Sequence, residues 1–224
     1  DEIGYHIIEN LSQEGAELSF NIEYTVLEVE LAHPILPGST TELNMNFKSQ
    51  IPVQIRRSGR DNKEGISYSM AQWYPKIAAY DTRGWHAEPY VAREFYAPWG
   101  QFDVSITIDK NYVVAASGIL ENNNAIGYGY QDDPLIDQKH KGRKLTWHFV
   151  NEKAHDFMWA ADPDYIHQIA QVPNGPKLHF FYQQGQATRH WEKLPEIIIA
   201  AFQYMNTHFG AYPFSDFYVI QGGD

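Results

Sequence analysis

Alternation of apolar and polar residues with a period of two dominates this chain up to about residue 182. It runs through residues 27–31, 43–47, 104–108 and 145–149. In the last of these, Leu145, Trp147 and Phe149 alternate with Thr146 and His148. Successive side chains of a strand point to opposite faces of its sheet, so each segment is predicted to be a strand with one buried and one solvated face.

Turn signals separate these segments, and no long helical pattern interrupts them. The signals are Pro37-Gly38-Ser39, residues 58–62, Asn122-Asn123-Asn124 and Pro173-Asn174-Gly175-Pro176. Many short strands without intervening helices are typical of antiparallel sheets. Aromatic residues, which favour strands, make up 15% of the chain. We therefore predict a mainly β fold, an antiparallel β-sandwich or curved sheet.

The periodicity changes near residue 186 to that of a helix. Apolar residues then recur at spacings of three and four, which places them on one helical face: Trp191, Leu194, Ile198, Ala201 and Met205. We predict a helix over residues 188–209 with Gly210 as its C-terminal cap. Pro195 is expected in the first turn or at a bend, because it donates no i→i−4 hydrogen bond.

A short strand is predicted after the helix, over residues 217–220. The chain then divides into an amino-terminal β domain, residues 1–182, and a second part, residues 183–224, whose helix and strand cannot form a core alone. Val219-Ile220 run into Gly222-Gly223-Asp224, the pattern of a strand entering a turn. We expect the strand that pairs with it to lie beyond residue 224. The end of the chain at residue 224 would then be an expression boundary or a proteolytic cut.

Composition excludes several classes of function. The net charge of −11 argues against nucleic acid or an anionic membrane as a partner, since both need clustered Lys and Arg. Cysteine is absent, which excludes disulfides and thiolate zinc sites. The longest apolar run, residues 197–202, is far below the ~18 residues of a spanning helix, so no membrane insertion is predicted.

The histidines form no recognisable metal motif, and H-E-x-x-H is absent. His86-Ala87-Glu88 has the H-x-E form of zinc deaminases, but without cysteine the partner motif is missing and a surface loop is favoured. His140, His148 and His155 are irregularly spaced, and His148 is predicted to be solvated. We expect no catalytic residue, metal or cofactor in this chain.

Acidic and aromatic residues gather in the middle of the chain, where they fit two interpretations. They could line a sugar groove, or the aromatics could fill a sandwich core with the acids at its rim, which we favour. The residues are Asp81, Glu88, Glu94 and Asp103 with Trp73, Trp85, Phe95 and Trp99.

Six segments in order resemble one enzyme family. They are VLEVELAHPILPGSTTELNMNF, QWYPKIAAYDTRGWH, EFYAPWGQFDVSITI, YVVAASGIL, LTWHFVNEKAHDFMWAADPDY and HFGAYPFSDFYVIQGG. This series resembles the amino-terminal region of the zinc aminopeptidases related to aminopeptidase N and leukotriene A hydrolase (gluzincins, peptidase family M-one), in a bacterial branch. The resemblance covers residues 26–224.

The resemblance implies a saddle-like β domain followed by the start of a thermolysin-like catalytic domain. It places the G-x-M-E strand and the H-E-x-x-H zinc motif after residue 224, so zinc is expected only in a full-length parent. It further implies that an amino-terminal Glu or Gln binds the α-amine of a peptide substrate. One alignment assigns this role to Gln72, with Tyr74 where the anchoring residue belongs; another places the anchor near Glu64.

Three functions remain after these arguments. The first is a non-catalytic amino-terminal domain of a zinc aminopeptidase that helps to shape the substrate cleft for peptides. The second is a stand-alone β-sandwich that binds glycan or protein, and the third is a scaffold whose relatives have lost catalysis. For the compartment, we favour the periplasm or cell surface of a bacterium over the cytoplasm.

Overall fold

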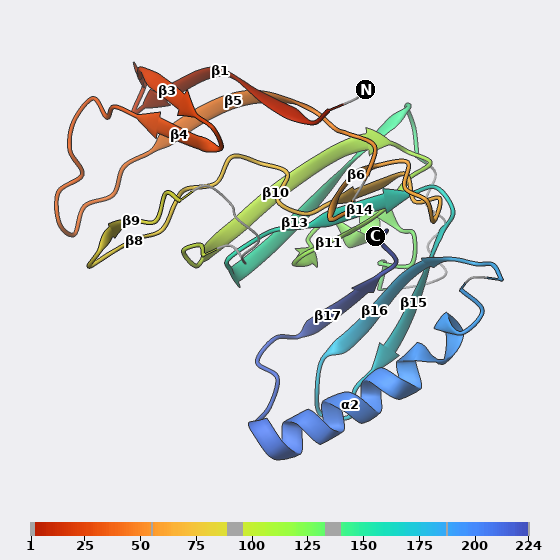
Figure 1. Cartoon of the computed structure of the whole chain (residues 1–224). Coiled ribbons are helices and arrows are strands. Elements are labelled where there is room, and N and C mark those ends of the chain that lie inside the picture. Colours follow the sequence, from red (N-terminus) through yellow and green to blue (C-terminus); the bar gives the residue numbers. More distant parts are fainter. Residues whose placement is uncertain (1–2, 55, 89–95, 133–139, 187, 224) are drawn as a thin grey trace. The chain divides into compact units, whose positions relative to one another are not determined.

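The computed structural model describes residues 3–54, 56–88, 96–132, 140–186 and 188–223. The chain forms two compact units (Figure 1). Unit 1 comprises residues 1–53 and 75–98, and unit 2 comprises residues 54–74 and 99–224. The domain boundary predicted between residues 182 and 183 rests on the change of periodicity, whereas the two units are defined by contacts between residues. The units do not test that boundary, which stays a prediction.

Unit 1 consists of strands in antiparallel pairs. Its larger sheet has the order β2-β1-β5, and β3 pairs with β4 and β8 with β9 in two hairpins. The alternating segment 43–47 falls in β5, and 27–31 begins in β4. The bounds are β1 (Tyr5–Gln13), β2 (Ala16–Glu17), β3 (Phe20–Glu23), β4 (Val26–Val29), β5 (Leu43–Gln50), β8 (Tyr80–Asp81) and β9 (Gly84–Trp85).

Two antiparallel sheets form the main core of unit 2. One has the order β10-β13-β12 and the other β11-β14-β7-β6. The first contributes Trp147 and Phe149 and the second Val114 and Ala160 to one buried cluster. The bounds are β6 (Ser58–Arg60), β7 (Tyr68–Met70), β10 (Gly100–Asp109), β11 (Val113–Ala116), β12 (Ile119–Leu120), β13 (Lys144–Ala154) and β14 (Trp159–Asp162). The predicted mainly β, antiparallel sandwich is thus confirmed.

A third sheet of unit 2 has the order β15-β16-β17, with bounds Tyr165–Gln171, Lys177–Gln183 and Asp216–Ile220. β16 pairs in parallel with β17. One edge of the last strand therefore has its partner within the chain, and the expectation that this partner is missing is wrong for that edge. The partner is earlier in the chain, and the connection between the two strands contains α2 (Leu194–Phe209). β15 and β16 therefore share a sheet with a strand from beyond the predicted boundary at 182/183.

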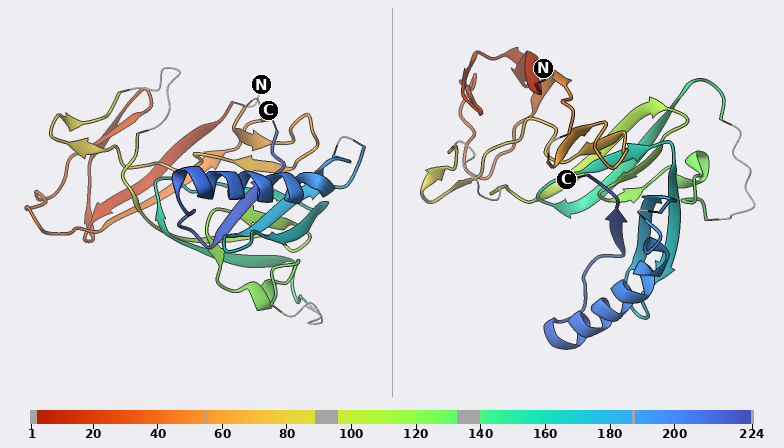
Figure 2. Two further views of the ribbon diagram at one scale, coloured as in Figure 1. Left: turned by 90° about the horizontal axis from the view of Figure 1, so that it is seen from below. Right: turned by 45° about the vertical axis from the view of Figure 1, so that its right-hand side comes forward.

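Helix α2 covers one face of this sheet (Figures 1 and 2). A short 3₁₀ turn, η1 (Trp191–Lys193), leads into it, so the α-helix begins at Leu194 and not at residue 188 as predicted. Pro195 lies in its first turn and Gly210 ends it with a φ of 103°, both as predicted. The predicted packing face is only partly right. The side chains that contact the sheet cluster are Trp191, Leu194, Ile198, Ile199 and Phe202.

Ala201 and Met205, which were assigned to the packing face, are exposed. The helix is apolar on several sides, so the sequence permits more than one face. The asparagine turn at 122–124 also differs from expectation, because it begins the single-turn helix α1 (Asn123–Ile126). In the described part of the chain, helices fall short of the length and apolarity needed to cross a membrane.

Candidate functional site

The terminal segment, residues 221–223, is held by hydrogen bonds from unit 2. The Gln221 amide donates to the Phe181 carbonyl over 2.8 Å, which extends the line of β17 beside β16. The Tyr165 hydroxyl donates to the Gln221 carbonyl, and the Gln183 amide donates to the Gln221 side-chain oxygen over 2.8 Å. Gln221 is thus fixed through both its backbone and its side chain.

Two buried amide side chains bind the far end of the terminal segment. Gln54 Nε2 donates to the Gly223 carbonyl over 3.0 Å, and Asn62 Nδ2 donates to Gln54 Oε1 over 3.1 Å. The Ile66 amide in turn donates to Asn62 Oδ1 over 2.8 Å. A Cβ atom at Gly223 would lie 2.0 Å from Asn62 Nδ2, so a larger residue does not fit there. We call Gln54, Asn62, Tyr165 and Gln183 the cradle.

The buried carboxylate of Asp162 contacts the cradle through Gln183. Asp162 has no exposed surface, and it accepts hydrogen bonds from the amide and hydroxyl of Ser67 at 2.9 and 3.0 Å. It also accepts bonds from the Asp164 amide at 2.8 Å and from Gln183 Nε2 at 2.9 Å. Four donors compensate for the loss of hydration of this group. Burial, with the Asp162 charge, raises the pKa of Tyr165, which keeps its hydroxyl a donor.

Gln72, the predicted substrate-binding residue, lies just after β7 and is half-buried. Its φ of 55° is in the left-handed region, which is uncommon for a residue with a side chain. Within the described residues, its side-chain amide makes no hydrogen bond. The neighbouring Trp73 Nε1 donates to the Phe157 carbonyl over 3.1 Å, which anchors this loop to the core. Contact between Gln72 and substrate stays a prediction.

The two alternative anchors have different environments. The Tyr74 hydroxyl donates to Asp156 Oδ1 over 3.2 Å, and burial with the Asp156 charge raises the pKa of Tyr74. Tyr74 is therefore already engaged within the protein. Glu64 is exposed in the turn between β6 and β7.

The acidic and aromatic residues of the middle segment divide between the two units. Trp73, Trp99 and Asp103 belong to unit 2, and Asp81, Trp85 and Glu88 to unit 1, whereas Glu94 and Phe95 lie outside the described residues. Trp73 packs against the main core, which fits the favoured interpretation for that residue.

The other members of the set that the structure describes are not core residues. Trp85 and Trp99 are largely exposed. Asp81 Oδ2 lies 2.8 Å from His86 Nε2, and the hydrogen bonds from the Arg83 amide and from His86 lower the pKa of Asp81. A sugar groove built from this set stays untested.

Histidines 86, 148 and 155 each contact neighbours within their own unit. His86 contacts Asp81 and the Tyr96 ring, whose centroid lies 4.9 Å from its own. His148 Nε2 lies 2.8 Å from Asp103 Oδ1 on the partly exposed face of β13, in line with the solvated position predicted for it. The His155 ring lies 5.1 Å from the Trp99 ring. Across the described residues, no group of three His, Asp or Glu side chains is arranged to hold a metal ion.

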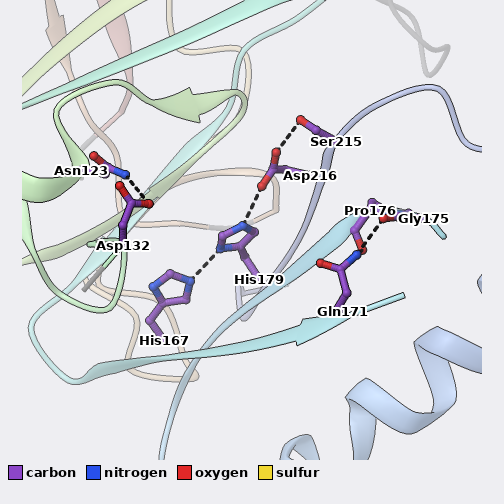
Figure 3. Close-up of polar contacts among 9 residues, drawn as sticks. All are labelled: Asn123, Asp132, His167, Gln171, Gly175, Pro176, His179, Ser215 and Asp216. Atoms are coloured by element: carbon purple, nitrogen blue, oxygen red, sulfur yellow. Dashed lines mark hydrogen bonds and ion pairs between the residues drawn. The ribbon is translucent and has the colours of Figure 1, made fainter. Parts of the chain in front are cut away.

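Sequence reasoning missed a second polar cluster, which lies on the β15-β16-β17 sheet. His167 Nε2 lies 2.8 Å from His179 Nδ1, and His179 Nε2 lies 2.9 Å from Asp216 Oδ1 (Figure 3). The Ser215 hydroxyl donates to Asp216 Oδ2 over 2.5 Å, and His167 Nδ1 lies 3.3 Å from the Tyr128 carbonyl oxygen. We call His167, His179 and Asp216 the histidine chain.

The comparisons with known proteins rest on structure alone. No family model and no curated protein matches the chain. The M1 zinc metallopeptidase from Deinococcus radiodurans superposes with a TM-score of 0.61 and 18% identity, covering 98% of this chain and 47% of that enzyme. The chain has the M1 zinc metallopeptidase fold. This confirms the fold-level resemblance predicted from the six segments.

Mutant forms of the M1 enzyme give similar superpositions. One, from the same organism and bound to a Tyr-Ser-Ala substrate, has a TM-score of 0.61 and 18% identity over 96% of this chain and 46% of its own. A two-domain mutant bound to L-tryptophan has a TM-score of 0.61 and 19% identity over 98% and 47%. This chain therefore spans about half the length of the M1 metallopeptidases that it matches.

Proposed function

We propose that this chain is the amino-terminal, non-catalytic part of a zinc-dependent aminopeptidase, and that it helps to shape the cleft for peptide substrates. The observation that carries the proposal is the M1 metallopeptidase fold over 98% of the chain. Structures with that fold bind a Tyr-Ser-Ala substrate or a free amino acid. Zinc, when bound by residues outside this chain, would polarise the scissile carbonyl and activate a water molecule.

The part of this chain in the reaction is to position the substrate. Gln72 is the candidate, because the residue is half-buried and its side-chain amide makes no hydrogen bond among the described residues. Its left-handed backbone also costs about 1–2 kcal/mol relative to a right-handed one, and such strain tends to gather at functional sites. In the proposal, the Gln72 amide oxygen accepts a hydrogen bond from the α-ammonium group of the substrate.

The test compares residues 1–224 with the product of the complete open reading frame, which the proposal expects to be longer. After dialysis, the longer protein is expected to retain zinc and to hydrolyse aminoacyl-coumarins, whereas residues 1–224 alone should do neither. A gene without coding sequence for a zinc-binding motif after residue 224, or turnover by residues 1–224 alone, would contradict the proposal.

Substitution of Gln72 tests the positioning role separately. Glycine accepts a φ of 55° without strain, so Gln72→Gly should leave the melting temperature unchanged or higher. Loss of a hydrogen bond to a charged group, worth about 1.5–3 kcal/mol, should lower kcat/KM by roughly tenfold or more. Gln101→Gly, on the exposed face of β10, is the control and should leave kcat/KM unchanged. An unaltered kcat/KM in Gln72→Gly would show that the Gln72 side chain does not bind the substrate.

One observation favours a second function, a module that binds glycan. Tyr80 and Trp85 are 69% and 64% exposed on the β8–β9 hairpin, and their rings lie 4.9 Å apart. Exposed aromatic pairs of this kind are typical of binding surfaces. Glycan binding that is lost in Trp85→Ala, together with a gene that stops at residue 224, would favour this function over the first.

A further inference from the structure

The histidine chain joins two ends that can only accept hydrogen bonds. One end is the Asp216 carboxylate and the other is the Tyr128 carbonyl oxygen. Between them lie two imidazole rings and three contacts, at 2.9, 2.8 and 3.3 Å. Neighbouring rings fix this arrangement, since Phe181 stacks on His167 at 4.2 Å and Tyr218 stacks on His179 at 4.7 Å.

The three contacts need more protons than two neutral imidazole rings carry. Each contact needs one hydrogen, and neither end supplies one while Asp216 is ionised. The two rings must therefore carry three protons between them. Two neutral imidazoles carry only two, because each has one donor and one acceptor nitrogen. All three hydrogen bonds form only when the chain holds one additional proton.

The surroundings indicate which group carries that proton. Burial, followed by the charges of His179 and Lys177, lowers the pKa of His167 to about 3, so His167 is neutral. The hydrogen bond from His179 lowers the pKa of the Asp216 carboxyl, so Asp216 is charged. The groups facing His179 are His167 from β15, Asp216 and Tyr218 from β17, and Tyr130 from the loop after α1. Of these groups, Asp216 is the one with a negative charge, and it bonds directly to His179.

We propose that the histidine chain is a proton-dependent latch, in which a His179 imidazolium paired with Asp216 fastens β17 and loop residues 128 and 129 to the sheet. His179 donates from Nε2 to Asp216 and from Nδ1 to His167 Nε2, and neutral His167 donates from Nδ1 to Tyr128. Such charge-assisted hydrogen bonds are about twice as strong as neutral ones. The latch involves neither the cradle nor Gln72, so it is independent of the proposed function.

Loss of the proton leaves two hydrogens for three contacts. The contact to the Tyr128 carbonyl is the longest of the three and is expected to open first. The loop lies directly on His167 at this point, since a Cβ atom at Gly129 would be 3.0 Å from His167 Nδ1. Raising the pH should therefore loosen residues 128 and 129 over His167 before it affects the strands. Tyr130 stays in place, because its ring is buried in the core and its hydroxyl donates to the Val114 carbonyl over 2.9 Å.

Imidazole nitrogen NMR on residues 1–224 tests the latch without any substitution. At pH 7, His179 is expected to show two protonated ring nitrogens and His167 a proton on Nδ1 alone. As the pH is raised until His179 loses one proton, amide protection of residues 128 and 129 should fall by about tenfold, in step with that loss. A singly protonated His179 at pH 7, or His167 protonated on Nε2, would overturn the proposal.

Substitution of the carboxylate supplies an independent measurement. In Asp216→Asn the doubly protonated state of His179 should be lost at pH 7, and protection of residues 128 and 129 should fall by a similar factor. Asp103→Asn is the matched control, because it removes the carboxylate of the partly exposed His148–Asp103 pair and should change neither signal. Retention of both protons on His179 in folded Asp216→Asn would also overturn the latch.

Discussion

At the scale of single residues, the histidines show what could be predicted from the sequence and what could not. β16 carries the run Leu178 to Tyr182, which is buried on both faces of the strand, with His179 as its one polar member. A histidine in such a run must find hydrogen-bond partners, so the sequence contained a signal for His179. Its partners were not predictable, because His167 and Asp216 are 12 and 37 residues away and meet it only through strand register.

The lowered pKa of His167 predicts a loss of stability on acidification. An unfolded histidine binds a proton below pH ~6.5, whereas His167 in the folded chain stays neutral down to about pH 3. The unfolded state therefore binds more protons in this window, and the free energy of unfolding should fall as the pH drops through it, by at most about 1.4 kcal/mol per pH unit. Asp216, whose pKa is also lowered, adds to the loss below pH ~4.

Urea unfolding at pH 7, 5.5 and 4 measures this dependence. His167→Gln keeps a side chain that can bond to His179 but removes the titrating group, so its stability should vary less with pH. His148→Gln is the control and should follow the wild type. Equal pH dependence in His167→Gln and the wild type would show that His167 is not the responsible group.

At the scale of elements, alternation correctly predicted β5, β10 and β13, and the helical period predicted α2, although the α-helix begins at Leu194 and not at residue 188. The packing face of α2 was predicted only in part. Pro195 in the first turn and Gly210 at the C-terminal cap mark the two ends of α2. Both signals depend on the local backbone alone, so they can be recognised in the sequence. The packing face depends on the sheet that α2 meets, and apolar residues occur on both its packed and its exposed sides. Parallel pairing of β16 with β17 was likewise missed, since it joins strands on either side of the helix.

Two adjacent isoleucines in α2 test which face of the helix packs on the sheet. Ile198 packs on the sheet cluster, whereas Ile197 is 60% exposed. Ile198→Ala should lower the free energy of unfolding by about 2 kcal/mol, because it leaves a partly filled cavity. Ile197→Ala should change it by at most about 0.5 kcal/mol. Chemical denaturation of both variants measures the difference, and equal losses would contradict the assigned face.

At the scale of the whole molecule, the mainly β class followed from alternation and turns, but the division into units did not. Residues 54–74 belong to unit 2 although the segments before and after them belong to unit 1. Such interleaving depends on contacts between distant segments, which no local pattern encodes. The two units also differ in their buried cores. Both apolar clusters lie in unit 2, whereas the buried apolar residues described in unit 1 are Leu11, Leu18 and Ala79.

This difference predicts unequal local stability in the two units. The β1–β5 and β10–β13 ladders are both long and antiparallel, which makes them a matched pair. Core side chains such as Trp147 and Phe149 cover β13, whereas β1 is exposed over most of its length. Opening β1 from β5 therefore uncovers less apolar surface, and hydrogen exchange should show protection at least about tenfold lower there than in β10–β13. Equal protection in the two ladders would mean that the units open together, as one cooperative structure.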